Sequence, residues 1–250
     1  LIVNSNLTLN APTLYFDLSS SPSGANDQIV LQGGLLTMSG TQNYNFNLLN
    51  YALGAGTYSL VSGAANNTAS GVSLVNNLPA NTRQIFAMQR PASGSSSGYV
   101  QLAVTGNAGS LVWQGTNGNN WDNATTNWQN GTAADKFFNL DQVRFDDTAS
   151  NGNVSIIGAV QPATVLVTNN LLTYTISNGV LAGVTSLTKS GPGMLILNSS
   201  NSFSGGTFVN GGTLQFVNNF YAGGVGPITL NGGTLYLNGI GTDTTVSSIG

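Results

Sequence analysis

The stretch NGGTLQF at residues 210–216 returns 21 residues later as NGGTLYL at residues 231–237. In each copy two apolar side chains alternate with other residues, so both lie on one face of an extended strand. A glycine pair precedes each strand, and glycine adopts the positive φ that a sharp corner requires. A motif that recurs at this interval indicates a structural repeat. The repeat positions are Gly211, Gly212, Leu214, Phe216, Gly232, Gly233, Leu235 and Leu237.

A strand signal upstream shows that the repeat begins before residue 210. MLILN at residues 194–198 places Leu195 19 residues before Leu214, and Leu235 follows Leu214 by 21. A period near 20 with two or three short strands predicts stacked coils of a parallel β-solenoid. Equivalent corners then carry Gly and Asn, and the Asn side chains form ladders between coils. The alternative is an antiparallel sandwich in which Asn-Gly pairs, such as 117–118 and 130–131, are hairpin turns.

The same kind of strand signal fills the C-terminal part of the chain. We expect strands at 164–168, 174–177, 185–189, 194–198, 207–210, 213–218, 228–231, 234–238 and 244–248. Composition agrees, because only 5% of the 250 residues are charged, Gly and Asn number 33 each, and Glu is absent. Helix formers are scarce while β-branched and aromatic residues supply strand preference. The sequence therefore predicts an all-β protein.

The composition also excludes several functions. Five cations against eight acids give a net charge of −3 and no basic stripe, so we expect no nucleic-acid partner. No apolar run reaches the length of a membrane-spanning helix. The chain has no Cys and no His, which removes thiolate chemistry, the common zinc sites and the usual general base. We expect no cofactor.

Three segments differ in character along the chain. Residues 1–110 have strand signals but no clean period, and residues 151–250 hold the solenoid pattern. Residues 111–150 hold all three Trp and five of the eight Asp residues. We expect this Trp/Asp-rich segment to be an insertion or a cap between two β regions.

Residues 187–216 resemble the autotransporter-associated β-strand repeat. The shared pattern runs Leu-x-Lys-x-Gly-x-Gly-x-Leu-x-Leu, then Asn-x-aromatic-x-Gly-Gly-Thr, then Gly-Thr-Leu. Its positions here are Leu187, Lys189, Gly191, Gly193, Leu195, Leu197, Asn201, Phe203, Gly205, Gly206, Thr207, Gly212, Thr213 and Leu214. The resemblance implies a right-handed parallel β-helix, exported to the surface or exterior of a Gram-negative-type bacterium. Looser similarities to passenger segments and to Trp-rich spacers lie upstream.

Three acids raise the question of a metal or catalytic site. Asp141, Asp146 and Asp147 lie close in sequence, and Ca²⁺ prefers carboxylate oxygens, so they are weak calcium candidates. A pair of carboxylates could also serve a polysaccharide-degrading enzyme. Adjacent residues on a strand point to opposite faces, however, so Asp146 and Asp147 do not suit a catalytic pair. The simpler interpretation is a turn-capping Asp beside an Arg144 ion pair, and we expect no catalytic residue.

The three tryptophans allow two interpretations. Trp113, Trp121 and Trp128 recur at intervals of eight and seven residues. Exposed rings would stack on sugars and form a possible glycan contact. Buried rings would instead close the end of a β region as a hydrophobic lid, and we favour this second interpretation.

These observations predict an extracellular structural or adhesive β-solenoid, one section of a stalk, fibre or coat. The alternative is a glycan-binding or polysaccharide-degrading β-helix. The uncharged, strand-like stretches LIVNSNLTLN and TTVSSIG at the two ends predict self-association or continuation into a longer chain. We expect no membrane-spanning segment.

Overall fold

The computed structural model describes residues 1–49, 52–64, 66–90, 92, 94, 98–217 and 221–239. Within these ranges every regular element is a β-strand, which confirms the all-β class. None of the described residues forms a helix able to cross a bilayer. The strand expected at 244–248 falls outside the described residues. The chain divides into two compact units, residues 1–80 with 84–107 and residues 81–83 with 108–250.

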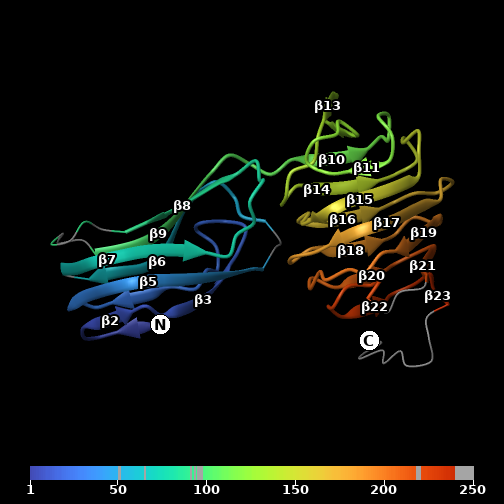
Figure 1. Cartoon of the computed structure of the whole chain (residues 1–250). Coiled ribbons are helices and arrows are strands. Elements are labelled where there is room, and N and C mark those ends of the chain that lie inside the picture. Colours follow the sequence, from blue (N-terminus) through green and yellow to red (C-terminus); the bar gives the residue numbers. More distant parts are fainter. Residues whose placement is uncertain are drawn as a thin grey trace. The chain divides into compact units, whose positions relative to one another are not determined.

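The first unit consists of two sheets, and the chain alternates between them from β3 to β8 (Figure 1). One sheet has the order β1-β4-β6-β9-β8, and in the other β5 pairs with β2, β3 and β7. Ile2 pairs with Val30 and Val30 with Ser62, so successive passes are 28 and 32 residues apart. The strands are β1 Ile2–Val3, β2 Leu7–Asn10, β3 Thr13–Leu18, β4 Ile29–Leu31, β5 Leu35–Leu48, β6 Gly56–Ala64, β7 Asn66–Asn76, β8 Ile85–Gln89 and β9 Gly98–Thr105.

The second unit also alternates between two sheets, now in shorter passes. From β14 to β23 each even-numbered strand joins one sheet and each odd-numbered strand the other, always parallel to the strand before it in that sheet (Figure 1). The strands are β10 Ser110–Trp113, β11 Asn120–Trp121, β12 Trp128–Asn130, β13 Ala133–Asp135, β14 Gln142–Phe145, β15 Asn153–Val160, β16 Thr164–Val167, β17 Tyr174–Leu181, β18 Ser186–Lys189, β19 Met194–Asn198, β20 Thr207–Val209, β21 Thr213–Val217, β22 Ile228–Leu230 and β23 Thr234–Asn238.

Not every strand pair is parallel. In the first unit β9 pairs antiparallel with β6 and β8, and in the second unit β12 pairs antiparallel with β10 and β13. Two of the four sheets are therefore mixed, which differs from a purely parallel expectation, while β14 to β23 pair in parallel throughout. Both departures are hairpins that add to one end of an otherwise parallel stack, since antiparallel strands need only a short turn between them.

The repeated NGG motif forms equivalent corners of successive passes. Gly212 and Gly233 have φ of 67° and 74°, the left-handed region that glycine adopts cheaply. A Cβ on Gly212 would lie 2.3 Å from the carbonyl oxygen of Gly191, so this corner also lacks room for a side chain. Asn231 Nδ2 donates to Asn210 Oδ1 at 2.9 Å, which confirms that Asn side chains link neighbouring corners.

The core of the second unit lies between its two sheets. Leu214 pairs with Leu195 on one side and with Leu235 on the other, so the three leucines form one inward row. Leu195 and Leu214 are fully buried, and Leu235 packs against the core while partly exposed. Lys189 also points inward, between Val167 and Val209, and its ammonium donates to the carbonyl oxygen of Gly191.

Candidate functional site

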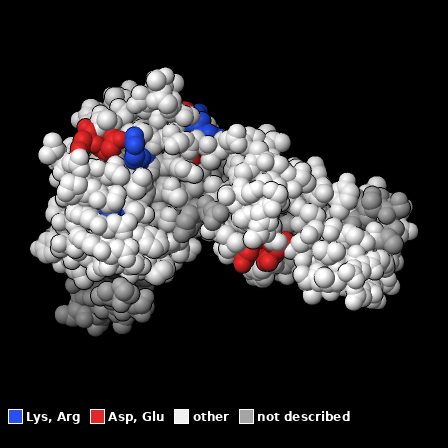
Figure 2. Space-filling model, turned by 180° about the vertical axis from the view of Figure 1, so that it is seen from behind, with Lys and Arg blue, Asp and Glu red and all other residues white. Residues whose placement is uncertain are grey.

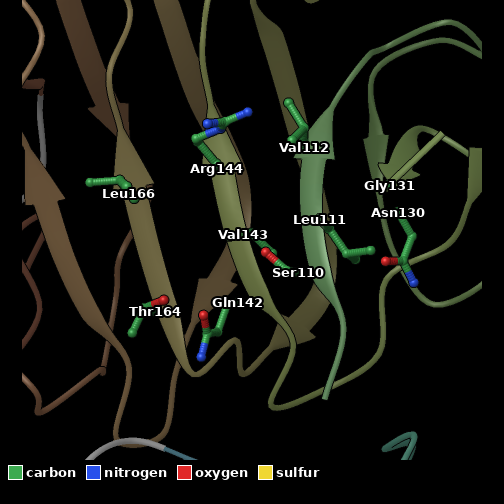
Figure 3. A pocket seen from close by; sticks show the side chains of 10 residues that line it. All are labelled: Ser110, Leu111, Val112, Asn130, Gly131, Gln142, Val143, Arg144, Thr164 and Leu166. Carbon is green, nitrogen blue, oxygen red and sulfur yellow. The ribbon is translucent and has the colours of Figure 1, made fainter. Parts of the chain in front are cut away.

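A groove crosses the outer face of the even-numbered sheet in the second unit (Figure 3). Its volume is about 520 Å³. The floor comes from the outward residues of β10, β14 and β16, and the β12–β13 hairpin contributes Asn130 at the end of β12 and Gly131 in the turn. The lining residues are Ser110, Leu111, Val112, Asn130, Gly131, Gln142, Val143, Arg144, Thr164 and Leu166.

Strand alternation sorts the groove residues into buried and exposed sets. Leu111 and Val143 point into the core and are at most 2% exposed. The outward positions align across the strands in two rows because the pairing is in register. One row is Ser110, Gln142 and Thr164, and the other is Val112, Arg144 and Leu166. The sheet thus presents a polar row beside a row that mixes aliphatic side chains with one cation.

Arg144 is the groove's charged residue. Its Nη2 lies 3.0 Å from Asp146 Oδ2, and the side chain is 49% exposed. Asp146 Oδ1 also accepts from the backbone nitrogen and the hydroxyl of Thr148, at 3.0 and 2.5 Å. Arg144 and Asp146 therefore form the turn-capping ion pair expected from the sequence. Figure 2 shows how few charged atoms interrupt the visible surface of this unit.

Asp147 has a structural task in the turn that follows β14. Its carboxylate accepts from the backbone nitrogens of Asn170, Leu171 and Leu172 at 2.9 to 3.1 Å. These hydrogen bonds, that from Leu172 first, lower the pKa of the Asp147 carboxyl. Asp147 therefore ties its own turn to the corresponding turn of the next pass.

Asp141 lies in a buried network of its own. It accepts from Arg83 Nε at 2.9 Å and from the backbone nitrogens of Gly109 and Phe138 at 2.6 and 2.9 Å. Burial raises the pKa of the Asp141 carboxyl, and these hydrogen bonds and the charge of Arg83 oppose that shift. Arg83 also contacts Asp135 and the carbonyl oxygen of Lys136. The network fixes residues 81–83 onto the second unit.

The three calcium candidates thus have separate partners. Among the described residues no three acidic side chains come together in a group that could hold a metal ion. Asp141 binds Arg83, Asp146 caps its turn, and Asp147 binds the next turn. The structure does not bring Asp141, Asp146 and Asp147 together as a set of ligands.

The tryptophans lie inside the second unit. Trp113, Trp121 and Trp128 are at most 1% exposed, and Trp128 packs edge-on against both others at ring distances of 5.1 and 5.2 Å. Phe137, Phe145 and Tyr174 extend this aromatic cluster. The suggested glycan contact needs an open ring face, and burial removes it from all three indoles. They pack as a core, as in the hydrophobic interpretation.

The groove itself was not identified from the sequence. Gln142 lies one residue after Asp141, in a stretch whose acids suggest a metal or catalytic site and whose neutral residues carry no local signal. The available signal was the alternation of SLVW at 110–113, QVRF at 142–145 and TVLV at 164–167, whose second and fourth residues are buried. Aligning these strands would have placed their outward residues in two rows.

Two comparisons with known proteins found similarity to parts of this chain. The family described as passenger-associated-transport-repeat matches residues 187–216, the segment from β18 into β21. A 65-residue segment is 45% identical to the adhesin BmaC autotransporter of Brucella suis biovar 1 (strain 1330). That segment is 26% of this chain and 2% of the adhesin. No solved structure matches the chain.

The matched repeat and the observed geometry coincide. The glycines and leucines of the shared pattern are the corner and core positions of successive passes through the two sheets. Residues 187–216 therefore match the passenger-associated-transport-repeat, and this match confirms the resemblance to the autotransporter-associated repeat over that segment.

Proposed function

We propose that this chain is a section of a structural and adhesive passenger on the surface or in the exterior of a Gram-negative bacterium. The observation that carries the proposal is the alternation of β14 to β23 between two parallel sheets through the matched repeat. Such a stack grows by adding passes and can span a long distance with one core. The similarity to a segment of an autotransporter adhesin supports the same role.

We further propose that the second unit is a right-handed parallel β-helix. Its passes advance by 19 to 22 residues from Val143 onward, as Val143 pairs with Val165 and Val165 with Leu187. Crossovers between parallel strands of one sheet are overwhelmingly right-handed, which supports the hand. Residues 111–150 serve as its capping segment, because the β12–β13 hairpin covers the outer edge of β10.

One experiment distinguishes the adhesive part of this role from the structural part. Beads coated with the purified 250-residue chain are applied to cultured host cells, and antibodies against the chain are applied to intact bacteria of the native source. Labelling of intact cells supports display at the surface, and bead attachment supports adhesion by this section itself. If antibodies label intact cells but the beads do not attach, this section of the passenger is structural and not adhesive. If intact cells are not labelled, surface display is refuted.

A non-enzymatic role is the second part of the proposal. The groove lining contains no carboxylate, and Asp146 and Asp147 are engaged by backbone groups of their turns. Incubation with a panel of polysaccharides should release no reducing ends above a buffer control. Release that disappears in Asp146→Asn or Asp147→Asn would refute this part.

A further inference from the structure

We propose that the outer-face groove of β10, β14 and β16 binds an acidic glycan chain. The proposal rests on the adhesive role above and names its ligand class. The groove is an open trough of about 520 Å³, a volume within the range of small-molecule sites. Its lining contains hydroxyls, side-chain amides, aliphatic carbons and one guanidinium.

The polar row supplies side-chain hydrogen-bonding groups that are not engaged by the part of the protein that the structure describes. The side chains of Ser110, Gln142 and Thr164 make no hydrogen bond with any described residue. They lie on three neighbouring strands, about 4.8 Å apart from strand to strand. Each offers both a donor and an acceptor, as the hydroxyls of a sugar do. A glycan lying across the strands would meet one such group at each strand.

Arg144 selects for negative charge on that glycan. A guanidinium has five N–H donors, and the ion pair with Asp146 engages Nη2 alone. Thr148 donates twice to Asp146 Oδ1, so one oxygen of this carboxylate keeps its partners whatever Arg144 binds. The remaining donors of Arg144 can bind a carboxylate or sulfate of the ligand. No acidic residue is among the lining residues, and the two carboxylates that adjoin the lining are already engaged, Asp146 by Arg144 and Asp135 by Arg83 and Asn130.

The apolar groove residues complete the match to a sugar chain. Val112 and Leu166 flank Arg144 in the second row, and Leu166 is 36% exposed (Figure 3). Sugar rings present C–H faces as well as hydroxyls, and aliphatic side chains pack against such faces. Asn130, the last residue of β12, stands at the side of the trough, where its side-chain oxygen is an additional acceptor.

Other classes of macromolecule fit this face less well. An extended peptide binds a sheet by pairing with a free strand edge. Here β14 and β16 are paired on both sides, and β12 covers the outer edge of β10, so the groove offers side chains only. Nucleic acid requires several cations along its phosphates, and the groove has one.

The test measures binding of a galacturonate hexasaccharide to the full chain by calorimetry. A sulfated hexasaccharide and the neutral cellohexaose serve as comparison probes. Arg144→Gln removes the charge, and Gln142→Glu adds a repelling carboxylate to the groove. Each should weaken binding of an acidic probe by at least about tenfold, the lower end of what charged hydrogen bonds contribute. Side-chain amide resonances of Gln142 and Asn130 should shift when the probe is added.

Lys136→Gln is the matched control, since it removes one positive charge outside the groove lining. It should leave binding unchanged. Equal weakening in Lys136→Gln would overturn the proposal, because attraction would then follow net charge. No binding of either acidic probe, or equal binding of cellohexaose, would overturn it as well. A chain that fails this binding test could still be displayed on the bacterial surface and attach beads to host cells. The antibody and bead experiments therefore test the proposed surface role separately from the groove.

Discussion

Lys189 is an unusual residue for the interior of a β stack. Its side chain is fully buried, and its ammonium donates to the carbonyl oxygen of Gly191 at the corner. Desolvation lowers its pKa from the ordinary value of 10.5 to about 8. Burying the charged ammonium of Lys189 with this hydrogen bond lowers the free energy of unfolding. In return, the hydrogen bond to Gly191 holds the corner of the repeat in place.

The lowered pKa predicts how the stability depends on pH. Between about pH 8 and the ordinary lysine value, the unfolded chain binds a proton that the folded chain has released. The free energy of unfolding should therefore rise with pH across this window, by on the order of 3 kcal/mol in total. Lys189→Met lacks this proton and should show no such rise, as urea titrations from about pH 7 to about pH 9.5 would reveal.

The upper limit of this pH range follows from the tyrosines. Burial raises the pKa of Tyr44 and Tyr174, so above the ordinary tyrosine value of 10.0 ionisation favours the unfolded chain and stability falls. Both proteins share this loss. Parallel pH profiles for the wild type and Lys189→Met below that limit would show that Lys189 is charged equally in both states.

At the scale of the strand, the inward row of leucines carries the stability of the repeat. Leu214→Asp would bury an unpaired carboxylate between Leu195 and Leu235, and should lower the free energy of unfolding by about 3–5 kcal/mol. Tyr236→Asp is the control, since Tyr236 follows Leu235 on the opposite face of β23 and is 51% exposed. Its effect should stay within about 0.5 kcal/mol. If urea denaturation shows the same loss of unfolding free energy for both variants, the assignment of Leu214 to the buried row is refuted.

The β13–β14 connection depends on the buried pair of Arg83 and Asp141. Asp141→Ala leaves a guanidinium without its main partner and two backbone donors unsatisfied, which should cost about 3–5 kcal/mol. The double variant Arg83→Ala/Asp141→Ala should cost less than the sum of the two single changes. A double-mutant cycle with additive losses would show that the two side chains do not stabilise one another.

The sequence predicts the strands well wherever the period is regular. All eight described strands expected between residues 164 and 238 are present, because apolar alternation and Gly corners recur there every 19 to 22 residues. In the first unit the passes vary between 28 and 32 residues, so no fixed period reveals them. The Arg83–Asp141 pair spans 58 residues, and no local pattern connects such partners.

The candidate site was harder to predict than the strands. The Asp and Trp residues that suggest chemistry in the sequence cap turns or fill the core in the structure. The groove depends on the register between β10, β14 and β16, and on the hairpin that follows β11. Register is a property of paired strands, so one strand's sequence does not show which outward side chains become neighbours.

At the scale of the whole molecule, the two compact units provide separate signals. All three Trp residues lie in the second unit, so Trp emission reports on that unit alone, whereas far-ultraviolet circular dichroism reports on the strands of both. Because each unit has its own contacts, we expect the two signals to give different denaturation midpoints. Coincident midpoints would instead show that the chain unfolds as one cooperative unit.

The one-pass-at-a-time pairing of β14 to β23 also determines how this unit would yield under tension. Each pass is hydrogen-bonded only to the passes beside it, so a pull on one end detaches strands in succession. The pass from Leu214 to Leu235 holds 21 residues, and detaching it releases roughly 70 Å of extended chain while shortening the stack by about 4.8 Å. A surface filament built this way would absorb a sudden load as a series of small ruptures and lengthen many-fold before it breaks.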